Sequence, residues 1–395
     1  MKVLLICPSD PSLFPELEFA EQPPVVLCPW ISNTIGLIRS SGDIELNVIS
    51  EFRLLKRDTV IERDDIKYHF LSQKIPYFHR GWPYRVKMIT GFRSLRKKVD
   101  HIIRTYNPDT IHLFGTEHDL AYCMKFIKRP SKLITIQGLI HEVVKTNKLN
   151  YYLTHKLEVE ADIFKTQQYF SVQDTRMEPL IHSYNPNAVI FQWTLPSESI
   201  EEFSKCRSVD KRSHISFFAR ITKDKGIEDL LHAIAVVKTI KSDVLLKIMG
   251  SCSYSYKNIL LKMIRDLDLS ENVEFVGYLE SRQKLFEEVA ASLMTVLPTY
   301  YDNVPKTIIE SIALGTPVIT YEPGMIPGIN NEGDVLIIVE TSNIYALAKS
   351  ITGILMDPVK QKLLARRGLE WFEKVHDNER LKNELIGMYK NISNR

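Results

Sequence analysis

The chain of 395 residues is longer than one hydrophobic core usually spans, so we expect two domains of about 200 residues each. Its 44% hydrophobic and 25% charged residues are ordinary for a soluble globular protein. The net charge of +3 is too small to indicate a nucleic-acid-binding protein. No apolar run approaches the roughly 18 residues that a membrane-spanning helix needs.

The cysteines and the first strand predict a cytoplasmic location. The first strand, Val3–Cys7, is too short for the apolar core of a signal peptide, and no small-residue cleavage site follows it. The five cysteines are odd in number and lack CxxC spacing, which indicates reduced thiols and neither a disulfide framework nor a metal site. They are Cys7, Cys28, Cys123, Cys206 and Cys252.

Strand-like and helical segments alternate through the first half, which predicts a parallel sheet with helices on both faces. The expected strands are Val3–Cys7, Glu45–Ile49, Tyr68–Leu71, Thr110–Phe114, Lys132–Ile136, Tyr169–Val172 and Ala188–Phe191. The expected helices are Trp30–Ser40, Pro83–Tyr106, Asp119–Ile127, Tyr152–Phe164 and Thr175–Ser183.

A polar, charged stretch from Pro196 to Ser213 interrupts this pattern and is the best candidate for a linker. The alternation then resumes with strands Ile215–Ala219, Val244–Met249, Val273–Val276, Ser292–Leu297, Pro317–Thr320 and Val335–Val339. Helices are expected at Gly226–Thr239, Lys257–Leu267, Arg282–Ala290 and Ile344–Leu355, and the tail Pro358–Ser393 is helical and amphipathic. The sequence therefore predicts two doubly wound α/β domains that face each other across a cleft.

Two carboxylates, Asp302 and Glu310, stand eight positions apart in one predicted βαβ unit. Asp302 follows the strand Ser292–Leu297, and Glu310 lies in the next helix, which ends at Gly315. Ligands of open α/β sheets bind at the carboxyl ends of the strands, so both carboxylates are expected at a ligand site. A lone Glu in a helix is usually solvated, and the frame around the pair favours a functional role.

A second group of polar residues follows the first strand of the second half. Arg220 ends this strand, and Lys225 stands directly before the helix that Gly226 opens. Two cations beside a helix N-terminus favour binding of a diphosphate. A basic surface turn is the plainer alternative. The Asp266–Asp268 pair could suggest a metal motif, but it lies at a helix end where a solvated turn is expected.

These motifs together resemble the retaining glycosyltransferases of family 4, which have the GT-B fold of two Rossmann-like domains. The resemblance rests on Arg220-x4-Lys225-Gly226, on Glu271–Gly277, and on Asp302-x7-Glu310 followed by Ala313–Val318. It implies that Arg220 and Lys225 hold the donor diphosphate, that Glu310 binds the ribose and that Asp302 contacts the donor sugar. Arg220, Lys225 and Asp302 are the implied catalytic residues. Further donor contacts are implied for Gly277, Asn303, Val304, Lys306 and Thr307.

The chain departs from the family pattern at several positions. Asp302 stands where the family usually has Glu, and Pro323–Gly328 replaces a turn that usually carries an acid. The usual glycine-rich loop of the first domain is absent, with Glu21–Ser32 in its place. Gly115–His118 and Thr135–Leu139 are similar to a branch among bacterial surface-polysaccharide enzymes. The acceptor-side candidates are Glu117, His118, Gln137, Gly138 and His141.

The segment Lys74–Arg104 carries nine Lys or Arg residues and one acid, Asp100, with aromatic residues between them. It fits a weak contact with an anionic membrane surface. A solvated basic helix is the alternative, and nucleic acid fits less well.

The resemblance implies transfer of a sugar from a UDP- or GDP-sugar to a saccharide or lipid-linked saccharide in bacterial surface-glycan assembly, with no cofactor and no metal. The expected domains are 1–200 on the acceptor side and 212–375 for the nucleotide-sugar, with a helix at 376–395 returning to the first. The alternatives are a non-hydrolysing nucleotide-sugar epimerase and a catalytically inactive sugar-nucleotide-binding partner. The location is cytoplasmic, with a possible peripheral contact at the inner face of the membrane.

Overall fold

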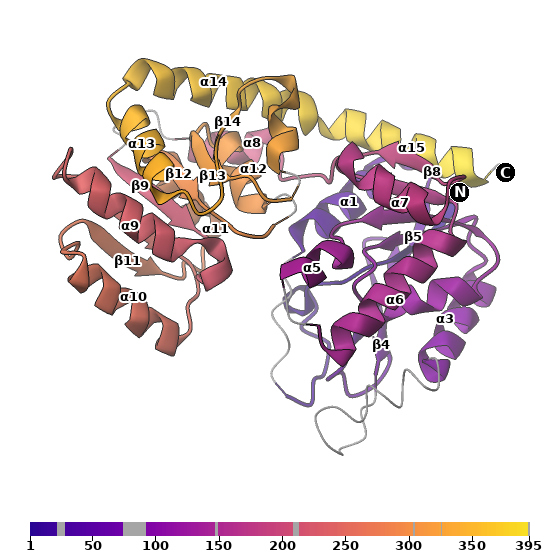
Figure 1. Cartoon of the computed structure of the whole chain (residues 1–395). Helices are drawn as coiled ribbons and strands as arrows, with labels where there is room; N and C mark the ends of the chain where they lie inside the picture. Colours follow the sequence, from indigo (N-terminus) through magenta and orange to yellow (C-terminus); the bar gives the residue numbers. More distant parts are fainter. Residues whose placement is uncertain are drawn as a thin grey trace. The chain divides into compact units, whose positions relative to one another are not determined.

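The computed structural model describes residues 1–21, 28–73, 92–146, 149–207, 213–302, 305–324 and 326–393. The chain forms two compact units (Figure 1). Unit 1 comprises Met1–Ser197 together with Asn378–Arg395, and unit 2 comprises Glu198–Asp377. Each unit is built on a parallel or nearly parallel sheet with helices, which confirms the expected fold class of two Rossmann-like α/β domains.

The sheet of unit 1 has eight strands in the order β3-β4-β2-β1-β5-β6-β7-β8. Its central strands β1 (Lys2–Ile6) and β5 (Thr110–Phe114) are buried almost throughout, as expected where helices cover both faces of a parallel sheet. The other strands are β2 (Glu45–Phe52), β3 (Thr59–Arg63), β4 (Ile66–Ser72), β6 (Ser131–Ile136), β7 (Tyr169–Val172) and β8 (Val189–Gln192).

The edge strand β3 corrects the expectation of a purely parallel sheet. β3 pairs antiparallel with β4, with Arg63 opposite Ile66. Asp64 and Asp65 form the connection, and both have positive φ angles of 54° and 62°. Aspartate is among the residues that tolerate this left-handed conformation, which tight hairpin turns require. The Asp64–Asp65 pair was thus a hairpin signal that the sequence analysis overlooked.

The helices of unit 1 agree in most places with the expected segments. They are α1 (Pro29–Ser40), α3 (Arg93–Tyr106), α4 (Asp119–Cys123), α5 (Ile140–Thr146), α6 (Tyr151–Thr166), α7 (Glu178–Tyr184) and α15 (Asn378–Ser393). Short 3-10 turns lie at Pro11–Leu13, Met124–Phe126 and Thr175–Met177. α5 was not expected. Residues 83–91 of the expected helix that begins at Pro83 lie outside the described residues.

The C-terminal helix α15 is part of unit 1 and packs against α1, β5 and β6. Two buried side chains fix it to the sheet. The hydroxyl of Tyr389 lies 2.6 Å from Nδ1 of His112 on β5, and the indole N–H of Trp193 donates to the Leu381 carbonyl at 3.0 Å. Residues from opposite ends of the chain therefore share one core.

The sheet of unit 2 has six strands, all parallel, in the order β11-β10-β9-β12-β13-β14. They are β9 (His214–Phe218), β10 (Leu246–Met249), β11 (Val273–Gly277), β12 (Ser292–Leu297), β13 (Val318–Tyr321) and β14 (Leu336–Val339). The helices are α8 (Ile200–Cys206), α9 (Ile227–Lys238), α10 (Tyr254–Asp266), α11 (Arg282–Ala290), α12 (Lys306–Ala313), α13 (Ile344–Leu355) and α14 (Pro358–Val375). Short 3-10 segments lie at Lys223–Lys225 and Ile326–Glu332.

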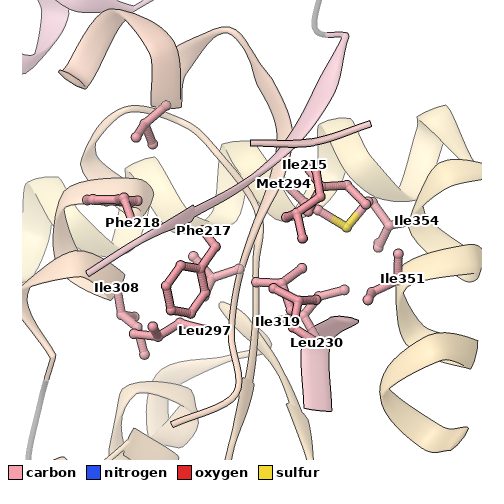
Figure 2. Packing of buried hydrophobic residues seen from close by; sticks show 14 of the residues in the cluster. Ile215, Phe217, Phe218, Leu230, Met294, Leu297, Ile308, Ile319, Ile351 and Ile354 are labelled. Atoms are coloured by element: carbon pink, nitrogen blue, oxygen red, sulfur yellow. The ribbon is translucent and has the colours of Figure 1, made fainter. Parts of the chain in front are cut away.

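Helices cover both faces of the unit 2 sheet. α9 packs with α10 and α13, while α11 packs with α8 and α12, and β12 contacts members of both groups. The core between sheet and helices is apolar: Phe217 of β9, Leu230 of α9, Met294 of β12, Ile319 of β13 and Ile351 of α13 pack together (Figure 2). This core holds the carboxyl ends of the strands at one edge.

The segment Pro196–Ser213, expected to be a linker, contains the helix α8. A reciprocal capping box begins this helix: the Ser199 side chain accepts from the Glu202 N–H, and the Glu202 side chain accepts from the Ser199 N–H. Phe203 and Cys206 are buried against the core of unit 2. The prediction was wrong because the polar composition of the segment hid a short helix with a capping signal.

Candidate functional site

The turn between β9 and α9 brings Arg220 and Lys225 to the carboxyl edge of the unit 2 sheet. Lys223–Lys225 form a 3-10 turn, and Gly226 has a φ of +70° as α9 begins. A Cβ added to Gly226 would lie 1.9 Å from the Pro298 carbonyl oxygen. Only glycine therefore allows this turn to pack directly against the loop that follows β12.

The loop after β12 places Asp302 beside Lys225. The Tyr300 N–H donates to the Asp224 carbonyl at 2.8 Å, and the Thr299 hydroxyl donates to the same oxygen at 3.2 Å. The Lys225 ammonium lies 2.6 Å from Asp302 Oδ2. Their side chains are 16% and 26% exposed, so the pair is sheltered yet open to solvent.

Arg220 lies at the same strand end and leaves its charge available. The residue is exposed, and its guanidinium makes no ion pair with the residues that the structure describes. Together with the Lys225 ammonium and the first N–H groups of α9, it forms a positive region at the carboxyl edge. Such a region suits a ligand that carries several anionic oxygens.

Glu310 lies one turn into α12 and is buried in a group of charged side chains. Arg282 donates to Glu310 Oε1 at 2.8 Å, and the Lys306 ammonium lies 3.7 Å from the same oxygen. Glu198 completes the group, 2.5 Å from Arg282 and 2.9 Å from Lys306. Both cation contacts of Glu310 fall on Oε1, and within the described ranges no contact is made to Oε2.

The electrostatics of this group differ between its two carboxylates. Burial raises the pKa of Glu310 above its usual value, although Arg282 and Lys306 act to lower it. Burial acts in the same direction on Glu198, but there Lys306 and Arg282 prevail and the pKa of that carboxyl falls below its usual value. Glu198 is thus the more strongly ionised partner of the two cations.

The remaining donor-side candidates divide into described and undescribed positions. Gly277 ends β11 with a φ of +82°, and no atom lies within 4 Å of a Cβ added there. Thr307 is half-buried in the first turn of α12. Asn303 and Val304 lie outside the described residues.

Sequence reasoning missed Arg282 and Glu198. Arg282 is the first residue of α11, where a cation faces the positive end of the helix dipole, so its position is unfavourable unless an anion is near. That mismatch was a usable signal. Glu198 had none, because 108 residues separate it from Lys306.

In unit 1, Glu117 and His118 follow β5 and line a cavity at the carboxyl edge of the sheet. Burial raises the pKa of Glu117 to about 7, although its own backbone amide and Lys156 act to lower it. Burial lowers the pKa of His118 to about 4. At neutral pH the imidazole is therefore uncharged.

The other acceptor-side candidates lie apart from this cavity. Gln137 and Gly138 follow β6, and neither lines the cavity. His141 of α5 lies 2.8 Å from the Tyr184 hydroxyl and 3.4 Å from Glu160, which also accepts from the Ile140 N–H. These contacts give His141 a role in fixing α5 to α6 and α7.

The part of the chain that the structure describes holds no group of three or more His, Cys, Asp or Glu side chains that could bind a metal. Asp268 instead pairs with Lys238 at 2.9 Å. None of the helices in the described ranges is long and apolar enough to cross a membrane.

Comparisons with known proteins give this geometry a context. Residues 180–371 match the model of the family described as glycosyl transferases group 1. The chain is 24% identical over 277 residues to the capsular polysaccharide biosynthesis glycosyltransferase CapM of Staphylococcus aureus, covering 66% of this chain and 70% of CapM. The chain is a glycosyltransferase.

Solved structures support the fold of this glycosyltransferase over its whole length. Sucrose-phosphate synthase from Thermosynechococcus elongatus matches with a TM-score of 0.77 and 17% identity, covering 99% of both chains. Anabaena HepE, solved in complex with UDP, matches with a TM-score of 0.70 and 14% identity, covering 99% of this chain and 100% of HepE. The glycosyltransferase thus has the GT-B fold.

Proposed function

We propose that this glycosyltransferase is a retaining enzyme of family 4 that transfers a hexose from a UDP- or GDP-sugar to a saccharide or lipid-linked saccharide. The observation that carries the proposal is the junction of two loops at the carboxyl edge of unit 2. There Lys225 Nζ lies 2.6 Å from Asp302 Oδ2, beside Arg220 and the start of α9. This junction places a diphosphate-binding cation next to a carboxylate that can hold the sugar.

The charges at the junction suit departure of a nucleoside diphosphate. As the bond from the sugar to the diphosphate breaks, negative charge grows on the leaving oxygen. Arg220 and Lys225 are the cations that neutralise it, and both are already in position. When the diphosphate binds, Lys225 exchanges part of its contact with Asp302 for phosphate oxygens, and Asp302 becomes free to accept from a sugar hydroxyl.

Glu310 is the proposed partner of the ribose. Its Oε1 is held by Arg282 and Lys306, which fixes the carboxylate in place. Its Oε2 is left to accept hydrogen bonds from the ribose hydroxyls. The proposal gives the further donor contacts to Gly277, Thr307 and Lys306, and to Asn303 and Val304 of the loop.

The choice of donor and pathway draws on the relatives. HepE was solved with UDP, which favours a uridine nucleotide, and CapM is described as a capsular polysaccharide enzyme, which favours a surface-glycan acceptor. On the acceptor side, the proposal retains Glu117 and His118 in the unit 1 cavity. Gln137, Gly138 and His141 would act only through the arrangement of the neighbouring α5.

A weak contact with an anionic membrane surface belongs to the same proposal. The first part of the basic segment lies outside the described residues, and α3 carries the rest. Two of its cations are engaged within unit 1, because Lys98 pairs with Asp58 and Arg96 lies over the Phe126 ring. Arg93, Lys97 and Arg104 remain exposed for anionic lipid headgroups in a cytoplasmic setting.

The test is incubation with a panel of UDP- and GDP-sugars, followed by NMR of the products. We expect slow release of the nucleoside diphosphate and of free sugar that first appears with the anomeric configuration of the donor. We also expect turnover to survive EDTA, because cations of the chain neutralise the diphosphate. A new nucleotide-sugar would instead show an epimerase, and an unchanged panel would show an inactive partner. A sugar released first with inverted configuration would reject the retaining mechanism.

A further inference from the structure

The cavity in unit 1 has a volume of about 200 Å³ and lies where β1, β2 and β5 end. Its polar lining comes from three parts of unit 1: the end of β2, the turn from β5 into α4, and α6. These polar side chains are Glu51, Arg53, Glu117, His118, Asp119 and Lys156.

The cations of this cavity are already engaged by the chain. Asp119 lies between them, with Oδ1 3.7 Å from Lys156 Nζ and Oδ2 3.5 Å from Arg53. Lys156 also donates to the Glu117 carbonyl, and its side chain is only 6% exposed. Glu51 accepts from the Gln73 amide. The cavity therefore offers little positive charge to an anionic ligand.

Two buried acceptor atoms at the cavity have no donor among the described residues. His118 Nε2 lies 2.8 Å from the Phe114 carbonyl oxygen, which can only accept, so Nε2 carries the hydrogen and Nδ1 carries a lone pair. Nδ1 of His118 and Oε2 of Glu117 are both buried and without a hydrogen-bond partner in the described structure. A buried acceptor without a donor costs about 1–3 kcal/mol, which a matching ligand would recover.

Gly115 holds the Glu117 carboxylate in this place. Gly115 has a φ of +81°, and a Cβ added to it would lie 2.4 Å from Glu117 Oε2 and 2.7 Å from the carboxylate carbon. The carboxylate thus folds back over a residue that has no side chain. Any other residue at position 115 would force the carboxylate away from its position.

We propose that this cavity binds neutral hydroxyl groups of the acceptor saccharide, with Glu117 Oε2 and His118 Nδ1 accepting hydrogen bonds from two of them. This inference rests on the proposed function, because it assigns the acceptor of the transfer. Both atoms can only accept when Glu117 is ionised, so the ligand must supply donors. Sugar hydroxyls do so, whereas phosphate and carboxylate groups bring further acceptors. Glu117 and His118 bind substrate in this account, and Gly115 is a positioning residue.

The experiment is saturation-transfer NMR with the methyl glycosides of glucose, galactose and N-acetylglucosamine, at a pH above the Glu117 pKa of about 7. The full chain is compared with Glu117→Met and with His118→Gln. Glutamine at position 118 can still donate to the Phe114 carbonyl but lacks the Nδ1 acceptor. We expect at least one glycoside to bind the parent and each variant to bind it at least tenfold more weakly.

Gly115→Ala and its control separate positioning from folding. Gly42 has a φ of +70° with no atom within 4 Å of an added Cβ, so Gly42→Ala introduces comparable backbone strain in unit 1 without touching the carboxylate. We expect Gly115→Ala to weaken the glycoside and Gly42→Ala to leave it unchanged. Circular dichroism and thermal unfolding of each variant identify any that fail to fold.

Three outcomes would overturn the inference: no glycoside saturates the parent, both Glu117→Met and His118→Gln bind as the parent does, or inorganic phosphate displaces the glycoside. The nucleotide-sugar panel keeps this failure separate from that of the proposed function. Donor turnover without glycoside binding would reject the hydroxyl site alone. Glycoside binding that the variants lose, without any donor turnover, would support the site and reject the proposed transfer.

Discussion

At the scale of single residues, the donor side of unit 2 is held together by contacts that a ligand can replace. Lys225 and Asp302 form a pair that is open to solvent on one side, and a pair of this kind typically contributes about 1 kcal/mol or less. Exchanging it for a phosphate contact therefore costs little. The Glu310 group differs, because Arg282 and Lys306 are both satisfied by carboxylates. It fixes a geometry, while Lys225 can adapt.

Replacing Lys225 by Ala should weaken UDP binding by about 1.5–3 kcal/mol, the range for a hydrogen bond to a charged group. That corresponds to roughly ten- to hundredfold in the dissociation constant. Lys223 is the matched control, because it belongs to the same turn but its side chain is 80% exposed. Calorimetry of UDP binding should show a loss for Lys225→Ala and almost none for Lys223→Ala. Equal affinities for Lys225→Ala and the parent would remove Lys225 from the donor site.

At the scale of elements, the periodic segments could be predicted and the short polar ones could not. Buried parallel strands such as Thr110–Phe114 are continuous apolar runs, so their bounds came out as expected. α8 was missed because its apolar side consists of little more than Phe203 and Cys206. β3 was missed because an edge strand alternates only weakly between buried and exposed positions.

The same limit applies to the site. Arg220, Lys225, Asp302 and Glu310 could be proposed from the sequence, because strand ends and helix starts are local signals. Whether they bind a donor remains a prediction. Glu198 could not be found, since only the folded chain brings it to Arg282 and Lys306. The orphaned acceptor atoms of Glu117 and His118 also depend on three-dimensional packing.

The close approach of two loops in unit 2 predicts the effect of a single methyl group. In Gly226→Ala the new Cβ would clash with the Pro298 carbonyl oxygen and move the loop that carries Asp302 away from Lys225. We expect UDP affinity to fall at least as far as in Lys225→Ala. Gly333→Ala is the control in the same unit, because its φ is +140° and nothing lies within 4 Å of an added Cβ. If both variants lose the same affinity, backbone strain explains the loss and the loop contact does not.

At the scale of the whole molecule, the C-terminal helix contributes to the core of a unit whose other residues come from the first half of the chain. His112 forms the centre of this contact, between the Tyr389 hydroxyl and the Thr135 hydroxyl, which in turn contacts Ser171. Burial lowers the pKa of His112 to about 3. The imidazole is therefore neutral wherever the unit is folded.

This contact predicts how the stability of unit 1 depends on pH. The pKa of His112 is about 6.5 in an unfolded chain and about 3 in the folded one, so between these values only the unfolded chain binds the proton. The contribution is complete above the unfolded value and is lost as the pH falls. Between about pH 7 and pH 5 the loss should be about 2 kcal/mol.

Hydrogen exchange of the β5 and β6 amides measures the stability of unit 1 separately from unit 2. Across the same pH interval, His112→Gln should be less stable at pH 7 but lose less stability on acidification than the parent. His232→Gln is the control, because His232 is exposed on α9 of unit 2. A His112→Gln variant with the full slope of the parent would show that other groups cause the pH dependence.

The most direct test of the account is a crystal structure of the protein with bound UDP. The account predicts the diphosphate within hydrogen-bond distance of Lys225 Nζ and the Arg220 guanidinium, at the start of α9. It also predicts the ribose hydroxyls on Glu310 Oε2, with Oε1 still held by Arg282. UDP bound elsewhere, or bound here with Lys225 still fully paired to Asp302 and Glu310 untouched, would contradict it.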